Sequence, residues 1–164
     1  MSESNVMPVV PAYTGEMDVD ESNRFLLLTD KHPTLEDIYV LQDLLFHNGN
    51  QVELVVKEYW AEGVYAREIF IPKGSCAVGK MHAKDQLSVM TKGEMTLMTE
   101  EGVIRIKAPF VMVAKPGIKR AVYAHEDTVF MSFHHNPDNL HDPVELEAML
   151  ILPPDQRRRL EKAP

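Results

Sequence analysis

A series of short strand-like runs between residues 51 and 135 constrains the fold of this chain more than any other feature. Turn-forming sequences separate the runs, and no helical pattern interrupts them. Short strands at regular spacing without intervening helices are typical of a β-sandwich or β-barrel. The expected strands are 51–56, Val64–Ile71, Cys76–His82, Leu87–Thr91, Glu94–Thr99, Val103–Lys107, Phe110–Ala114, Lys119–Ala124 and Thr128–His134.

Helical patterns flank this β region on both sides. Thr34 and Asp37 resemble a capping box in front of apolar residues at helical spacing. Asp142 and Pro143 form a plausible cap and first-turn pair for a second helix. We therefore expect an extended arm over residues 1–31, a helix over 32–50 that packs on the barrel or on a neighbouring subunit, a β-barrel over 51–135, and a helical tail over 136–164.

The length and charge of the chain exclude several classes of protein. A chain of 164 residues is long enough for one hydrophobic core with additional segments at both termini, and it is short for two domains. The formal charge of −8 argues against a nucleic-acid-binding surface, which needs a positive field. No apolar run approaches the length of a membrane span, and the N-terminus lacks the pattern of a signal peptide. The single cysteine, Cys76, excludes an intrachain disulfide.

A string of short segments carries a resemblance to a known family. The segments are Ala66–Gly74, Gly79–His82, Ala108-Pro109, Pro116–Arg120, Ala124–Val129 and Phe133-His134. Together they resemble small cupin-like proteins of the RmlC-like superfamily that are common in bacteriophage genomes. The resemblance covers about Val64 to His135, which is under half of the chain. It implies a single double-stranded β-helix, or jelly-roll, barrel, a viral origin and an oligomeric protein, but no particular activity.

The same resemblance implies that the metal-binding positions of the two cupin motifs are degenerate. Counting back from Gly93 places Gln86 at the glutamate position, His82 at the second histidine and Lys80 at the first. In the second motif, Arg120 stands where a histidine is expected. Only His82 among the expected ligands is retained. The loss of the metal ligands looks like a trait of the group that the chain resembles.

The inward positions of such a barrel would form a cationic polar cluster. Hairpin pairing of the last two strands would place His134 or a neighbour across from Arg120. The candidate ligand-binding interior therefore comprises Lys80, His82, Gln86, Arg120 and His134. Lys80 and Arg120 would clamp a small anion, while the other side chains orient it through hydrogen bonds. The alternative is an interior satisfied by its own side chains and buried water, with no ligand.

A metal site is a weaker alternative, because lysine and arginine do not coordinate cations at neutral pH. His82 and His134 would have to hold a divalent transition metal with help from water or Gln86. Such a site would favour a cupin enzyme, an isomerase, lyase or oxygenase. The other enzymatic alternative is metal-free acid–base catalysis by His82, which would lie beside Lys80. We assign no catalytic residue, because the sequence identifies no inward carboxylate to pair with either histidine.

The preferred interpretation is a non-enzymatic, homo-oligomeric cupin-like protein of phage type with a structural or accessory role. The N-terminal arm and the C-terminal tail would join subunits and bury Leu26, Leu27, Leu28 and the apolar face of the helix Leu35–Leu45 against a neighbour. Other virion proteins and a small anionic ligand are further possible partners. The expected location is the cytoplasm of an infected host or the virion.

Overall fold

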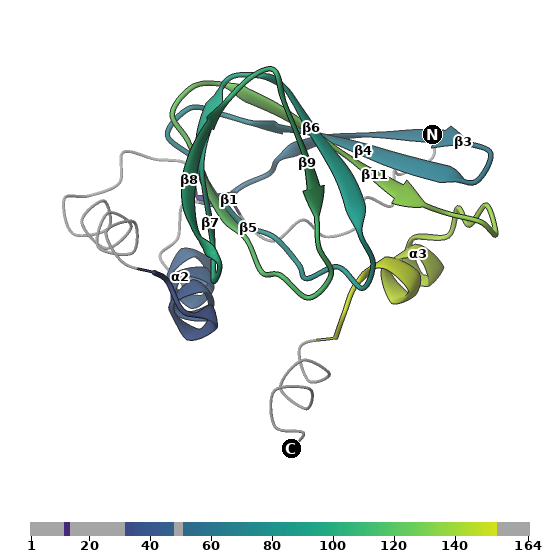
Figure 1. The fold of residues 1–164 in the computed structure, drawn as a ribbon, viewed down its shortest axis with the longest axis horizontal. Coiled ribbons are helices and arrows are strands. Elements are labelled where there is room, and N and C mark those ends of the chain that lie inside the picture. Colours follow the sequence, from purple (N-terminus) through teal and green to yellow (C-terminus); the bar gives the residue numbers. More distant parts are fainter. Residues whose placement is uncertain (1–11, 14–31, 48–50, 154–164) are drawn as a thin grey trace.

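Two antiparallel sheets face each other and form a barrel in the computed structural model, which describes residues 12–13, 32–47 and 51–153 (Figure 1). The six-stranded sheet has the order β2 (Gln51–Val52), β1 (Ala12–Tyr13), β5 (Cys76–Val78), β10 (Ala121–Ala124), β7 (Glu94–Thr99), β8 (Gly102–Lys107). The five-stranded sheet has the order β3 (Val55–Ala61), β4 (Val64–Ile71), β11 (Thr128–His135), β6 (Gln86–Lys92), β9 (Phe110–Ala114). From β4 onward the chain repeatedly crosses between the sheets, which is the connectivity of a jelly roll. The fold is a single cupin-like barrel.

Several strands have the bounds that the sequence predicts, and others differ for identifiable reasons. β4, β7 and β9 coincide with their predicted ranges. The single strand expected over 51–56 is divided between β2 and β3, which belong to different sheets. The strand expected over 76–82 ends at Val78 as β5, and His82 instead forms an isolated bridge with Ile151 from the C-terminal segment.

Helix α2 (Leu35–His47) packs on the outside of the six-stranded sheet. Its capping box is confirmed, since the Thr34 amide donates to Asp37 Oδ2 at 2.8 Å and the Asp37 amide donates to Thr34 Oγ1 at 3.2 Å. Its buried face contacts the protein's own barrel through Ile38, Leu41, Leu45, Cys76, Val78, Met98 and Ala121. Of the two predicted alternatives, the helix therefore packs on the barrel, and its Leu35–Leu45 face is not the subunit contact that was expected. Leu26 to Leu28 lie outside the described residues.

Helix α3 (Pro143–Leu150) closes one end of the barrel (Figure 1). The predicted cap is confirmed, because Asp142 Oδ1 accepts from the Val144 amide at 2.9 Å and the Glu145 amide at 3.1 Å. Leu146 and Leu150 are buried against Tyr65 of β4. The next residues then run beside the barrel wall, where the Leu152 amide donates to the Met81 carbonyl at 2.9 Å. The C-terminal segment therefore contributes to the barrel interior.

Gly93 makes the tight connection between β6 and β7. Its φ is +92°, a conformation that favours glycine. A Cβ atom at this position would come within 2.5 Å of the Asp127 carbonyl oxygen. The turn at Gly93 therefore packs closely against the segment at Asp127 and Thr128. It connects β6 of one sheet to β7 of the other.

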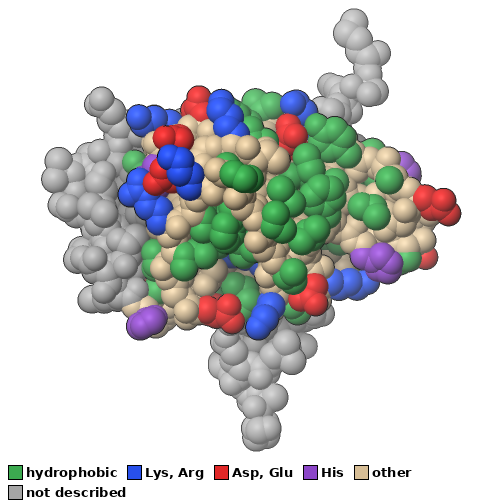
Figure 2. Space-filling view, turned by 45° about the horizontal axis from the view of Figure 1, so that its top comes forward, with side chains coloured by type: hydrophobic (Ala, Val, Ile, Leu, Met, Phe, Trp, Pro, Cys, Tyr) green, Lys and Arg blue, Asp and Glu red, His purple; other side chains and the backbone are tan. Residues whose placement is uncertain are grey.

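The outer surface carries apolar side chains on β6 and β9. Leu87, Val111 and Val113 have exposed fractions of 45%, 60% and 64%. Leu87 lies directly opposite Val113 in the β6–β9 register. Figure 2 shows hydrophobic side chains grouped on the visible face of the molecule, with charged residues around them. Within the described part of the chain, no helix has the length and apolar character needed to cross a membrane.

Candidate functional site

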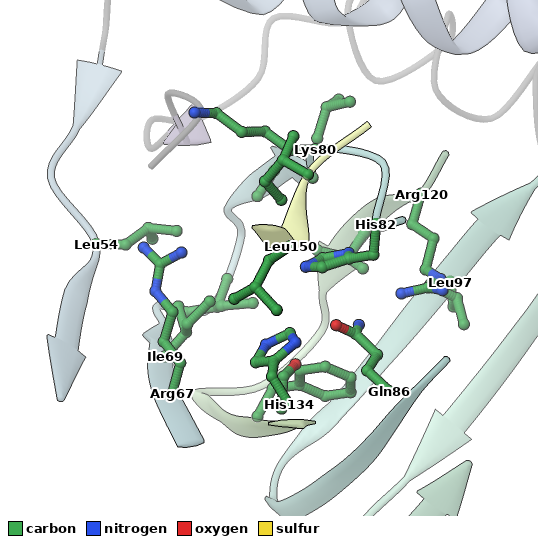
Figure 3. Close-up of a pocket in the computed structure, with 18 of the residues that line it drawn as sticks. Leu54, Arg67, Ile69, Lys80, His82, Gln86, Leu97, Arg120, His134 and Leu150 are labelled. Atoms are coloured by element: carbon green, nitrogen blue, oxygen red, sulfur yellow. The ribbon is translucent and has the colours of Figure 1, made fainter. Parts of the chain in front are cut away.

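A cavity of about 160 Å³ lies between the two sheets. All five residues that the sequence predicts for the interior line it: Lys80, His82, Gln86, Arg120 and His134. Figure 3 shows most of these side chains, together with the C-terminal Leu150 that enters from α3. The structure adds Arg67 and Ser132 as polar residues of the lining. Ligand binding by any of them stays a prediction.

Arg67 reaches the cavity because it lies on the inward face of β4. Tyr65, Arg67, Ile69 and Ile71 all line the cavity, as expected for alternate residues of one strand. Sequence reasoning missed Arg67. The signal was present, because an arginine between apolar inward positions of a strand is an unusual placement.

One edge of the Arg67 guanidinium, formed by Nε and Nη2, has no hydrogen-bond partner within the protein. Nε and Nη2 are both buried and form no hydrogen bond. Glu58 lies opposite Arg67 in the β3–β4 register, yet its Oε1 accepts a 2.6 Å hydrogen bond from the Tyr65 hydroxyl. Nε–H and Nη2–H point in the same direction and match the two oxygens of a carboxylate. The cavity therefore contains an unused binding edge for an oxyanion.

His82 and His134 are stacked inside the cavity and are uncharged at neutral pH. Their ring centroids lie 5.1 Å apart, with an angle of 22° between the planes. Burial, together with smaller effects of His134, Arg120 and Arg67, lowers the pKa of His82 to about 3. Burial, together with the Arg67 charge, lowers the pKa of His134 to about 4. His82 Nδ1 is buried and forms no hydrogen bond.

Gln86 begins β6 and presents its carboxamide to the cavity. The residue is 3% exposed, and its Oε1 atom is buried without a hydrogen-bond partner. Figure 3 shows the side chain between Arg120 and His134, with its oxygen facing the interior. A buried acceptor without a donor is costly, so this atom is a second unused position in the same cavity.

Arg120 enters from the six-stranded sheet, just before β10. Burial lowers its pKa, although an arginine remains charged at neutral pH. Its Nη2 donates to the Lys115 carbonyl at 3.4 Å. β10 and β11 belong to different sheets, so the predicted hairpin pairing of Arg120 with His134 is wrong. The two side chains line the same cavity from opposite sides of the barrel.

Lys80 contributes mainly to the closure of the barrel. Its Nζ donates to Glu147 Oε1 on α3 at 2.5 Å. Figure 3 shows the amino group directed away from His82 and His134. The Lys80 charge is therefore balanced by a carboxylate, and its predicted role as an anion clamp stays a prediction.

The electrostatic balance of the cavity favours anions. Arg67 and Arg120 both place a guanidinium in the lining, and none of the described lining residues is an aspartate or a glutamate. This positive interior lies within a chain whose formal net charge is −8. An anion that enters would meet two fixed positive charges in a site largely shielded from water, where electrostatic attraction is strongest.

The same side chains do not fit a divalent transition metal, the cofactor that a cupin barrel suggests. The rings of His82 and His134 are stacked and nearly parallel, so their in-plane lone pairs lie in nearly parallel planes and do not converge on one point. A metal would need both nitrogens at about 2.0–2.1 Å and at least one further ligand. In the described parts of the chain, no three His, Cys, Asp or Glu residues gather in a suitable group.

Comparison with known proteins gives structural matches only. No family model matches the chain, and no curated protein matches it. An RmlC-like cupin family protein from Methanocaldococcus jannaschii is 20% identical, with 58% of this chain and 86% of that chain covered and a TM-score of 0.45. A cupin superfamily protein from Desulfitobacterium hafniense is 10% identical, with coverages of 51% and 77% and a TM-score of 0.45. The Cnp3 cupin domain of Schizosaccharomyces pombe is 13% identical, with coverages of 52% and 69% and a TM-score of 0.44. Function has to be argued from the cavity itself.

Proposed function

We propose that this protein is a non-enzymatic binding protein that holds a small organic carboxylate inside its barrel. The observation that carries the proposal is that Arg67 lines the cavity and that its Nε and Nη2 atoms are buried without a partner within the protein. A carboxylate placed on this edge would accept two parallel charge-assisted hydrogen bonds. Arg120 supplies a second positive charge in the same cavity.

The rest of the lining supports an organic ligand rather than an inorganic ion. Leu54, Ile69, Leu97 and Leu150 provide apolar walls around the polar groups. A dry cavity of about 150 Å³ in another protein accommodates benzene, and the cavity here has a similar volume of about 160 Å³. The expected ligand is a monocarboxylate with a short apolar body.

The state of the histidines supports binding over acid–base catalysis. A general base works best when its pKa is close to the operating pH. The pKa values of His82 and His134 are lowered to about 3 and about 4, so both rings are weak bases. Neither ring has a carboxylate partner among the described lining residues. Removal of a proton from a substrate is therefore poorly supported by this site.

We retain the homo-oligomeric, phage-type accessory role as part of the proposal. The arm and tail that would join subunits, or contact other virion proteins, lie largely outside the described residues. Assembly would cover the exposed apolar side chains Leu87, Val111 and Val113 on the outer sheet surface. Light scattering on the purified protein tests this part, and a strictly monomeric mass at micromolar concentration would contradict it.

The binding proposal is tested by isothermal titration calorimetry with short alkanoates in a carboxylate-free buffer. We expect wild-type protein to bind pentanoate or hexanoate, and Arg67→Met to weaken binding by at least about tenfold, because charge-assisted hydrogen bonds are lost. Arg105→Met is the matched control, since Arg105 is an exposed arginine of β8 that pairs with Glu94. Circular dichroism checks that both variants fold. Equal affinity in wild type and Arg67→Met would overturn the proposal, as would the absence of any alkanoate binding.

A further inference from the structure

We infer that the carboxylate bound in the barrel is a hydroxy acid whose hydroxyl group donates a hydrogen bond to Gln86 Oε1. This inference rests on the proposed function and identifies the class of ligand. Arg67 recognises the carboxylate, and Gln86 recognises the hydroxyl at a separate position in the cavity.

The first argument concerns the chemistry of the Gln86 oxygen. A carboxamide oxygen accepts hydrogen bonds and cannot donate them. Gln86 Oε1 is buried without a partner in a residue that is 3% exposed. The backbone of Gln86 is held in the β6–β9 ladder opposite Ala114, so the side chain begins from a fixed position. A ligand that supplies a donor here removes the cost of an unsatisfied buried acceptor.

The second argument concerns the charge of that donor. The electrostatic influence of both Arg67 and Arg120 reaches His82, which lines the same cavity as Gln86. No Asp or Glu is among the described residues that line this cavity, although Glu101, outside the lining, offsets part of the Arg120 charge. An ammonium group would be repelled in this environment, whereas a hydroxyl would not. The donor is therefore neutral.

The third argument compares a hydroxyl with a second carboxylate at the Gln86 position. An ionised carboxylate has only acceptor oxygens, so it could accept from the Gln86 amide or from Arg120 but would leave Gln86 Oε1 without a donor. A hydroxyl can donate to Gln86 Oε1 and at the same time accept from a nearby donor such as Arg120. A hydroxy monocarboxylate therefore satisfies this region better than a dicarboxylate.

The fourth argument concerns the arrangement of the two polar positions. Figure 3 shows Arg67 and Gln86 on opposite sides of the cavity, with Leu150 extending between them. The carboxylate and the hydroxyl of the ligand therefore lie at opposite ends, and an apolar segment passes Leu150. This arrangement describes an ω-hydroxyalkanoate or a compact ring analogue of one.

The inference is tested by calorimetry with matched probes on wild-type protein. The probes are butanoate, pentanoate and hexanoate, each compared with its ω-hydroxy, ω-amino and dicarboxylate counterpart. We expect at least one ω-hydroxy acid to bind about tenfold more tightly than its alkanoate, because a buried acceptor becomes satisfied. The amino and dicarboxylate counterparts should bind no more tightly than the alkanoate.

Gln86→Leu provides the second measurement. We expect this variant to bind alkanoates and ω-hydroxy acids with equal affinity, while Gln42→Leu on α2, outside the described cavity lining, keeps the preference. Equal binding of hydroxy acid and alkanoate by wild-type protein would overturn the inference and leave carboxylate binding intact. A preference that persists in folded Gln86→Leu would also overturn it. If no probe binds wild-type protein, the proposed function itself fails, and the inference fails with it.

Discussion

At the scale of single residues, the cavity combines polar groups that are each unusual in a protein interior. Arg67 is charged and presents an unpaired edge, Gln86 has an unpaired acceptor, and His82 has an unpaired ring nitrogen. Buried polar atoms of folded proteins are usually hydrogen-bonded to protein or to water, so these atoms mark positions where water or a ligand would bind. A ligand that pairs with several of these atoms at once would gain binding free energy from each of them.

The buried histidines give the protein a defined sensitivity to acid. The folded-state pKa values of His82 and His134, about 3 and about 4, lie below the usual value of 6.5. As pH falls below 6.5, the unfolded chain therefore takes up protons before the folded protein does, and stability is lost. Between about pH 6.5 and about pH 4, each histidine should reduce the free energy of unfolding by about 1–3 kcal/mol.

Urea unfolding across this pH range measures the effect. His134→Gln should show a smaller loss of stability with acid than wild type, because one titrating group is removed. His135→Gln is the control, since His135 is the next residue of β11 and is exposed. If His134→Gln lost stability with acid as steeply as wild type, the buried neutral state of His134 would be refuted.

At the scale of secondary-structure elements, the sequence predicted the features that depend on residues close together in the chain. The caps of α2 and α3 depend on residues two or three positions apart, and both were predicted. Only the first two residues of β3 were predicted, because most of its side chains are exposed on both faces and no alternating pattern marks the rest of the strand. The bridge between His82 and Ile151 could not be predicted, because the two residues are far apart in sequence.

The connection at Gly93 gives a prediction at this scale. Gly93 and Gly63 both have positive φ, but a Cβ at Gly63 would meet nothing within 4 Å. Gly63→Ala should therefore cost about 1–2 kcal/mol for the backbone conformation alone. Gly93→Ala should cost at least about 1 kcal/mol more, because its Cβ would collide with the backbone at Asp127 and Thr128. Chemical denaturation of the two variants measures this difference, and equal stability losses would contradict the close packing at Gly93.

At the scale of the whole molecule, the sequence predicted the barrel and most of the polar interior. Strand alternation and the spacing of the two cupin-like motifs predicted inward positions for His82, Gln86 and Arg120, and all three line the cavity. The partner of Lys80 could not be predicted, because Glu147 lies 67 residues away and reaches Lys80 only when α3 closes the barrel. Whether a buried charge is paired depends on such distant contacts, so the placement of Arg67 on β4 could be suspected from the sequence but its lack of a partner could not.

X-ray diffraction from crystals soaked with a short bromoalkanoate would test the central claim most directly. The anomalous signal of bromine locates the apolar end of the probe, and the electron density shows its carboxylate. Our account predicts bromine inside the barrel and both carboxylate oxygens within hydrogen-bonding distance of Arg67 Nε and Nη2. A probe bound inside the barrel with its carboxylate away from Arg67, or a cavity without bound probe at saturating concentration, would contradict it.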